Sequence, residues 1–216
     1  ACSMLREKIQ AFGAGMLELP VEDTRFDGIC VTGQGRQVSL TEIAVQATCG
    51  NVQELQATAS FSSMISPPPY MAGLAEVEID PETGSVEVTD YVAVVDCGTP
   101  VNPNLARVQT EGGIVQGIGM ALTEEVQYTD IGRIRNNSFM QYKIPSRMDV
   151  GQIRVEFESS YEETGPFGAK SIGEIVINTP APAIADAVYN ATGLRFRTLP
   201  ITAEQVLMGL LDKEEA

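Results

Sequence analysis

A glutamate at the end of a glycine-rich segment is the strongest candidate for acid–base chemistry in this sequence. Residues 165–174 read GPFGAKSIGE, so three glycines and a proline accompany Glu174. The chain contains no histidine, the commonest general base, so proton transfer would fall to Glu, Asp, Lys or Tyr. One interpretation is that Gly173 holds Glu174, as a base, in a backbone shape that other residues cannot adopt. The alternative is a glutamate that favours the N-terminus of a following helix through the helix dipole.

Two glutamines in a second glycine-rich segment, residues 104–125, are candidates for binding a polar ligand. A G-x-x-x-G-x-G pattern occupies residues 113–119. It lacks the G-K-[ST] ending of a phosphate loop and the strand–turn–helix order of a dinucleotide fingerprint, so an independent nucleotide-binding protein is disfavoured. Gln109 and Gln116 are seven residues apart, which places them on one helical face. They are either solvated amides or the lining of a face where a backbone or flat ligand approaches closely.

Composition disfavours several other classes of function. The net charge of −15 disfavours binding to nucleic acid, because phosphates would be repelled. The four cysteines form no C-x-x-C pair, so neither a metal site made by this chain alone nor a disulfide framework is expected. The absence of histidine excludes Ser-His-Asp and Cys-His triads. No segment approaches the roughly 20 apolar residues of a membrane span, and the N-terminal segment lacks the long apolar region of a signal peptide, so we expect a cytoplasmic protein.

Hydrophobic periodicity and capping signals predict an α+β fold around these candidates. Helical spacing, with capping boxes at Ser39/Glu42 and Thr202/Gln205, predicts helices over residues 1–19, 39–50, 104–125, 178–193 and 202–211. The first helix is expected to bury the face formed by Met4, Leu5, Ile9, Phe12 and Met16. Alternation and apolar runs predict strands over residues 28–33, 138–144 and 153–160, and a hairpin over 74–96 that turns at Gly84.

A proline-rich segment divides the predicted elements into two mixed α/β lobes. SPPPYMAG, residues 66–73, contains three consecutive prolines, which cannot continue a helix or a central strand. We therefore expect an N-terminal lobe over residues 1–66 and a C-terminal lobe over 67–216 that carries Glu174. The chain begins without a helix cap, so the first lobe is expected to start mid-domain, either as an excised piece or as a natural split subunit.

Five motifs together resemble the molybdenum hydroxylases, the xanthine dehydrogenase and aldehyde oxidase family. The motifs are AEVEIDPETGSVEV, DCGTPVNPNLARVQTEGGIVQGIGMALTEE, NSFMQYKIPSRMDV, GAKSIGE and LPITAEQVL, and they occur in the family's order. The resemblance covers nearly the whole chain and is to the C-terminal part of the molybdenum-binding subunit. It implies the cofactor-binding fold and a molybdenum–molybdopterin cofactor, in its plain or dinucleotide form. In the family a dithiolene of the pterin holds the metal, so no metal ligand is expected from this chain.

The resemblance also implies roles for individual residues. Glu174, in GAKSIGE, matches the base that takes a proton from the attacking hydroxyl. The reaction hydroxylates an electron-poor carbon of a purine, another N-heterocycle or an aldehyde, with water as the oxygen source. Gln109, in VQTEGG, matches a glutamine that hydrogen-bonds the pterin. Lys170, Ser171 and Gly173 belong to the loop beside the cofactor, so they are expected to bind it.

The resemblance further implies partners for this chain. The family's upstream cofactor-binding segments, its iron–sulfur cysteine motifs and its flavin-binding part have no counterpart in the sequence. We therefore expect a missing molybdenum-binding segment or subunit, with iron–sulfur clusters and FAD on partner segments or subunits, and no turnover by this chain alone. The alternative is a non-catalytic assembly module of such a complex. The presence of Glu174 and Gln109 in their motifs favours the enzyme, because an assembly module has no need of the base.

Overall fold

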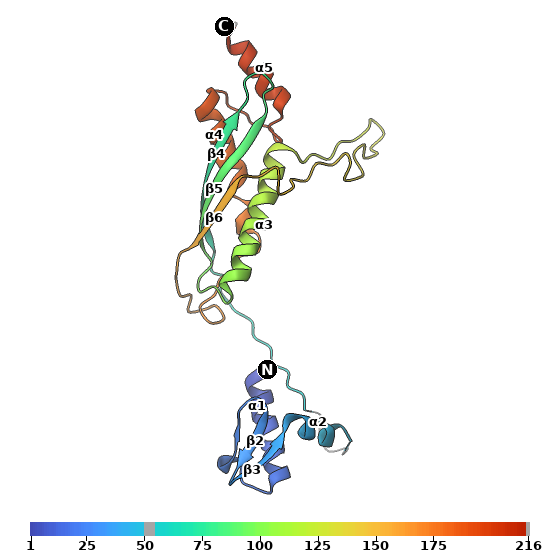
Figure 1. The fold of residues 1–216 in the computed structure, drawn as a ribbon, viewed down its shortest axis with the longest axis vertical. Helices are drawn as coiled ribbons and strands as arrows, with labels where there is room; N and C mark the ends of the chain where they lie inside the picture. The colour runs from blue at the N-terminus through green and yellow to red at the C-terminus, as the bar shows by residue number, and fades with distance from the viewer. Residues whose placement is uncertain (50–54, 215–216) are drawn as a thin grey trace. The chain divides into compact units, whose positions relative to one another are not determined.

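Two compact units, residues 1–62 and 63–216, form the protein. The computed structural model describes residues 1–49 and 55–214. The sequence places the boundary slightly later, after residue 66. Each unit combines helices with an antiparallel or mixed sheet, which confirms the expected α+β class (Figure 1). Within the described ranges, no helix is long and apolar enough to cross a membrane.

The first unit is a three-stranded antiparallel sheet with two helices. Its elements are α1 (Cys2–Leu17), the 3-10 turn η1 (Val21–Asp23), β1 (Arg25–Phe26), β2 (Cys30–Gly33), β3 (Arg36–Ser39) and α2 (Leu40–Cys49). The strand order is β1-β2-β3. The core is formed by Ile9, Leu17, Phe26, Val31, Val38 and Ile43. A Cβ at Gly13 would lie 2.6 Å from Cγ2 of Val31, so glycine allows α1 to pack closely on β2.

Local signals in the first unit are confirmed, but the predicted buried face of the first helix is partly wrong. The Ser39/Glu42 capping box forms, with the Ser39 amide donating to Glu42 Oε2 at 2.8 Å. The buried face of α1 consists of Ile9, Gly13, Ala14 and Leu17, whereas Met4 and Met16 are exposed. Leu5 and Phe12 pack against the core as expected, whereas Gly13 and Ala14 take the place of the methionines, since the close contact at Gly13 leaves no space there for a side chain. The predicted end of α2 near Gly50 lies outside the described residues.

The second unit builds a three-stranded sheet with two helices on one face. Its elements are β4 (Tyr70–Ile79), β5 (Val86–Asp96), α3 (Pro103–Leu122), β6 (Gln152–Phe157), the 3-10 turn η2 (Ile175–Ile177), α4 (Pro180–Thr192) and α5 (Ala203–Glu214). β4 and β5 form an antiparallel hairpin, and β6 pairs with β5 in parallel, so α3 belongs to the crossover (Figure 1). Residues from β5, α3 and α4 share one core, including Tyr91, Val95, Ile114, Ile118, Ile184 and Val188.

The predicted hairpin and the two C-terminal helices are confirmed. Gly84 has φ +72°, and its amide donates to the carbonyl of Asp80 at 2.7 Å, as the turn requires. Gly193 ends α4 with φ +74°. The Thr202/Gln205 capping box precedes α5. Thr179 stands at the N-cap of α4 but makes no capping bond, since its backbone is helical (φ −90°, ψ −27°) and not extended as in a capping residue. Its hydroxyl instead accepts a hydrogen bond from Tyr91 Oη at 2.9 Å.

Two predictions in the second unit are wrong. Residues 138–144 form turns instead of a strand, since the amides of Gln141 and Tyr142 both donate to the Ser138 carbonyl. Phe139 and Met140 are consecutive and both more than 80% exposed, so this segment has no buried face of the kind that alternation implies. The predicted linker over residues 66–73 is also too long, because β4 already begins at Tyr70.

Candidate functional site

The glycines of α3 allow the segment after Glu174 to pack directly on the helix. A Cβ at Gly113 would lie 2.2 Å from Cγ2 of Val176, in η2. A Cβ at Gly117 would lie 2.6 Å from Cγ of Pro180, the first residue of α4. Such distances are below any ordinary contact, so both positions require glycine. This close packing fixes the place of η2, and therefore of Glu174 before it, along α3.

A hollow of about 280 Å³ lies where α3 meets the start of η2. It is lined by Val108, Gln109, Gly112, Gly113, Gln116, Gly173, Glu174, Val176 and Ile177. Three of the five predicted site residues, Gln109, Gly173 and Glu174, therefore share one cavity although they are far apart in the sequence. Gln116, which the sequence places on the same helical face as Gln109, lines it as well.

A hydrogen bond connects the two sides of this hollow. Nε2 of Gln109 donates to the carbonyl oxygen of Gly173 at 2.8 Å. The bond ties α3 to the residue directly before Glu174, and it uses the amide nitrogen of the glutamine. Because an amide side chain has an acceptor oxygen opposite its donor nitrogen, Oε1 of Gln109 is the atom left to accept a bond from a ligand.

Gly112 and Gly173, which line the hollow, have open space beside them, in contrast to the closely packed Gly113 and Gly117. An ideal Cβ at Gly112 or at Gly173 would have no heavy atom of the described chain within 4 Å. Gly173 also lacks the positive φ that only glycine adopts readily, so the expectation that its backbone shape requires glycine is wrong. The absence of both side chains leaves space on the two walls of the hollow, next to Gln109 and Glu174.

Glu174 stands at the position that precedes η2. Its backbone has φ −119° and ψ −13°, and its side chain makes no capping hydrogen bond to the turn. The residue is exposed and belongs to the lining of the hollow. The alternative interpretation is a glutamate that stabilises a helix N-terminus through the helix dipole. It is weakly supported here, because η2 is a single three-residue turn.

Lys170 and Ser171 lie on the approach to the hollow and are not among its lining residues. Nζ of Lys170 lies 2.5 Å from Oδ2 of Asp96, and the lysine side chain is only 8% exposed. Lys170 first and the Ser160 hydroxyl second lower the pKa of Asp96 to about 2. Ser171 is exposed. Sequence reasoning missed Asp96; its signal is a carboxylate at the end of an apolar strand, followed by the turn residue Gly98.

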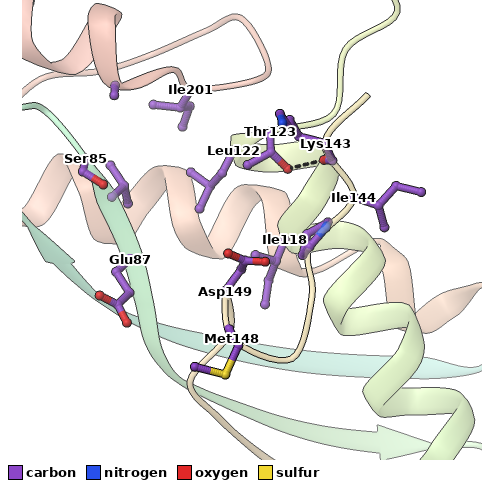
Figure 2. Close-up of a pocket in the computed structure, with 13 residues that line it drawn as sticks. Ser85, Glu87, Ile118, Leu122, Thr123, Lys143, Ile144, Met148, Asp149 and Ile201 are labelled. Atoms are coloured by element: carbon purple, nitrogen blue, oxygen red, sulfur yellow. Dashed lines mark hydrogen bonds between the residues drawn. The ribbon is translucent and has the colours of Figure 1, made fainter. Parts of the chain in front are cut away.

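Two larger cavities of the second unit lie elsewhere. One of about 520 Å³ lies between the start of β5, the end of α3 and residues 143–149 (Figure 2). The Thr123 hydroxyl donates to the Lys143 carbonyl at 2.8 Å on its wall. A second, of about 540 Å³, contains Glu111 and Arg147 and shares Val108 and Gly112 with the hollow. Neither is lined by any of the five predicted site residues, all of which are described.

Comparison with known proteins places the fold in a family. The molybdopterin cofactor-binding domain family matches residues 1–151. The chain is 37% identical over 214 residues to the probable hypoxanthine oxidase XdhD of Escherichia coli K12, covering 97% of this chain and 22% of that protein. It is 32% identical over 217 residues to the aldehyde oxidoreductase molybdenum-binding subunit PaoC of the same strain, covering 98% of this chain and 29% of that protein.

A solved structure agrees with these relatives. The crystal structure of quinoline 2-oxidoreductase from Pseudomonas putida 86 matches with a TM-score of 0.71 and 30% identity, over 97% of this chain and 28% of that one. The chain thus spans less than a third of the length of each protein that it matches here. Since the family match covers well over half of the chain, the protein belongs to the molybdopterin cofactor-binding domain family of the molybdenum hydroxylases.

Proposed function

We propose that this chain is a portion of the molybdenum-binding subunit of a xanthine dehydrogenase-like molybdenum hydroxylase, with Glu174 as its catalytic base. The reaction hydroxylates an electron-poor carbon of a purine, another N-heterocycle or an aldehyde, with water as the oxygen source. The observation that supports it is the convergence of Gln109, Gly173 and Glu174 on one hollow. The relatives are named as a probable hypoxanthine oxidase, an aldehyde oxidoreductase subunit and a quinoline 2-oxidoreductase, and these names support this range of substrates.

The chemistry of the hollow fits a molybdopterin. Gly112 and Gly173 leave its two walls without side chains, so a flat ring system can approach the backbone. Oε1 of Gln109 and the amide of Gln116 offer hydrogen bonds to the polar edges of a pterin. Residues 1–49 and 55–214 hold no cluster of three or more His, Cys, Asp or Glu side chains that could bind a metal ion. When bound, the cofactor supplies the molybdenum centre that accepts two electrons from the substrate carbon.

The chain's own residues then bind, orient and move a proton. Gln109, Gln116 and the backbone at Gly173 would hold the pterin inside the hollow. Lys170 and Ser171 do not line the hollow, so they would contribute to cofactor binding by positioning the loop that carries Gly173. Glu174 accepts the proton of the attacking hydroxyl, a task that suits a carboxylate held at the edge of a cavity. Iron–sulfur clusters and FAD on partner segments or subunits would carry the electrons away, so we expect no turnover by the isolated chain.

The test is Glu174→Gln in the assembled enzyme. Loss of a general base lowers turnover by about 10²- to 10⁴-fold, and we expect a loss in this range with an unchanged molybdenum content. Glu163→Gln is the matched control, because Glu163 is an exposed glutamate outside the hollow. Full turnover in the Glu174 variant would remove the residue from the mechanism. That outcome, together with loss of assembly when the chain is deleted, would favour the non-catalytic assembly module instead.

A further inference from the structure

We propose that Asp96 is a positioning residue for Glu174, because its carboxylate clamps both ends of the loop that delivers the glutamate to the hollow. The inference rests on the proposed function of Glu174. Asp96 does not line the hollow, so it acts through the loop and not on a substrate or cofactor.

The carboxylate of Asp96 contacts three groups at the end of β5. Oδ1 accepts a hydrogen bond from the Ser160 hydroxyl at 2.6 Å and from the Gly98 amide at 3.0 Å. Oδ2 accepts one from Nζ of Lys170 at 2.5 Å. Ser160 and Lys170 are the two ends of an eleven-residue excursion, residues 160–170, and one carboxylate therefore holds them together. The Gly98 contact fixes the orientation of the carboxylate itself.

Lys170 depends on this carboxylate. Its side chain is 8% exposed, and its ammonium also lies 5.4 Å from the centroid of the Tyr70 ring. A buried ammonium needs an anionic partner, since removal of one member of a buried pair leaves an uncompensated charge. Without Asp96, Lys170 would turn towards solvent and would pull the main chain of the loop with it.

The backbone transmits the position from Lys170 to Glu174. The Lys170 amide donates to the Cys97 carbonyl at 2.7 Å, and Ala169 forms an antiparallel bridge with Gly98. Beyond Lys170, Ile172 packs against the main core. The Gly173 carbonyl is then held by Gln109. The segment is thus held at several residues, and the Asp96–Lys170 contact is the one ion pair that the described residues form with it.

The experiment is a double-mutant cycle in the assembled enzyme, with Asp96→Asn and Glu174→Gln alone and together. A displacement of about 1 Å in a catalytic group can cost 10²-fold in rate. We expect Asp96→Asn to lower kcat by about 10- to 100-fold while KM and molybdenum content stay unchanged. In the Glu174→Gln background the same change should alter the residual rate less than about threefold, because two residues that act through one step are not additive.

Asp90→Asn is the matched control. Asp90 lies on the same strand, has the same 21% side-chain exposure as Asp96, and pairs with Arg154 on β6 away from the loop. We expect it to change kcat less than about twofold in either background. Hydrogen exchange read by mass spectrometry adds a measurement that does not need turnover. The amides of Ala169 and Lys170, which donate to the carbonyls of Pro166 and Cys97, should exchange at least about tenfold faster in Asp96→Asn, and at the wild-type rate in Asp90→Asn.

Three outcomes would overturn the inference. Unchanged exchange at the amides of Ala169 and Lys170 would show that Asp96 does not hold the loop. A loss in kcat that persists in the Glu174→Gln background would show that Asp96 acts by another route. Wild-type turnover of Glu174→Gln by itself would refute the proposed function and, with it, this inference. If Asp96→Asn does not assemble, the double variant Asp96→Asn/Lys170→Met leaves no unpaired charge and is expected to show the same kcat loss and faster exchange.

Discussion

Adding one methyl group at two neighbouring positions of α3 should have opposite effects on stability. Alanine is about 1 kcal/mol more favourable than glycine in a helix interior. At Gly112 the new Cβ meets nothing within 4 Å, so we expect this gain in full, a rise of about 2–4 °C in the melting temperature of the second unit. At Gly113 the Cβ would lie 2.2 Å from Cγ2 and 2.9 Å from Cβ of Val176. Overpacking of this kind costs about 1–3 kcal/mol or more, so Gly113→Ala should be destabilising overall.

The cofactor content of the assembled enzyme should not change in the same direction as the stability of the chain. Gly112 lines the hollow, where a methyl group would occupy the space that we assign to the pterin. Gly112→Ala should therefore give a more stable chain and an assembled enzyme with at least about tenfold less molybdenum. The assays are thermal unfolding of the 216-residue chain and metal analysis of the assembled enzyme.

A matched control separates helix propensity from the site. Gly15, in α1, is also open around its ideal Cβ and lies in the first unit. Gly15→Ala should leave the molybdenum content unchanged. A fully loaded Gly112→Ala enzyme would refute the assignment of this hollow to the pterin. A Gly113→Ala chain as stable as the wild type would refute the close packing of α3 on η2.

Two further predictions concern polar side chains that are held by hydrogen bonds. The pKa of Asp96 is lowered from 3.8 to about 2 in the folded chain, so the stability that its hydrogen bonds contribute is fully present above about pH 4 and is lost as the pH falls through about 2. The difference in unfolding free energy between wild type and Asp96→Asn should therefore be constant from pH 4 to 7 and shrink towards pH 2. A difference that is unchanged at pH 2 would contradict this. Thr179→Val should lower the free energy of unfolding by about 1–3 kcal/mol, because it leaves the fully buried hydroxyl of Tyr91 without its partner. Chemical denaturation should show that Tyr91→Phe in the same chain recovers most of this loss in stability. No recovery would mean that the loss comes from packing instead.

Local features of the fold were predictable from the sequence, since their causes lie within a few residues. The capping boxes of α2 and α5 each depend only on residues i and i+3. The turn of the hairpin depends on a glycine at position 84, where the backbone has a positive φ. The strand predicted at 138–144 failed because alternation indicates a strand only where a partner strand and a buried face exist. The prediction that Met4 and Met16 are buried in α1 was wrong, because periodicity does not show how closely a helix approaches its sheet.

The candidate site was predictable in its residues but not in its assembly. Extended motifs indicated Gln109 and Glu174, yet the hydrogen bond between Gln109 and Gly173 joins positions 64 residues apart and has no local signature. A similarly long separation explains why Asp96 was missed, since its partner Lys170 lies 74 residues further along the chain. The sequence also gave no means to tell the glycines that pack, such as Gly113, from those that leave open space, such as Gly112.

The parallel pairing of β6 with β5 has a consequence for the order of folding during synthesis. The β4–β5 hairpin can form as soon as residue 96 has left the ribosome, because its strands are joined by a short turn. The other edge of β5 has no partner until residues 152–157 are made, and pairing across so many residues is intrinsically slow. An unpaired strand edge is a template for association with other chains. Completion of the second unit therefore waits for β6, and the nascent chain is most vulnerable to aggregation while residues 97–151 are being translated.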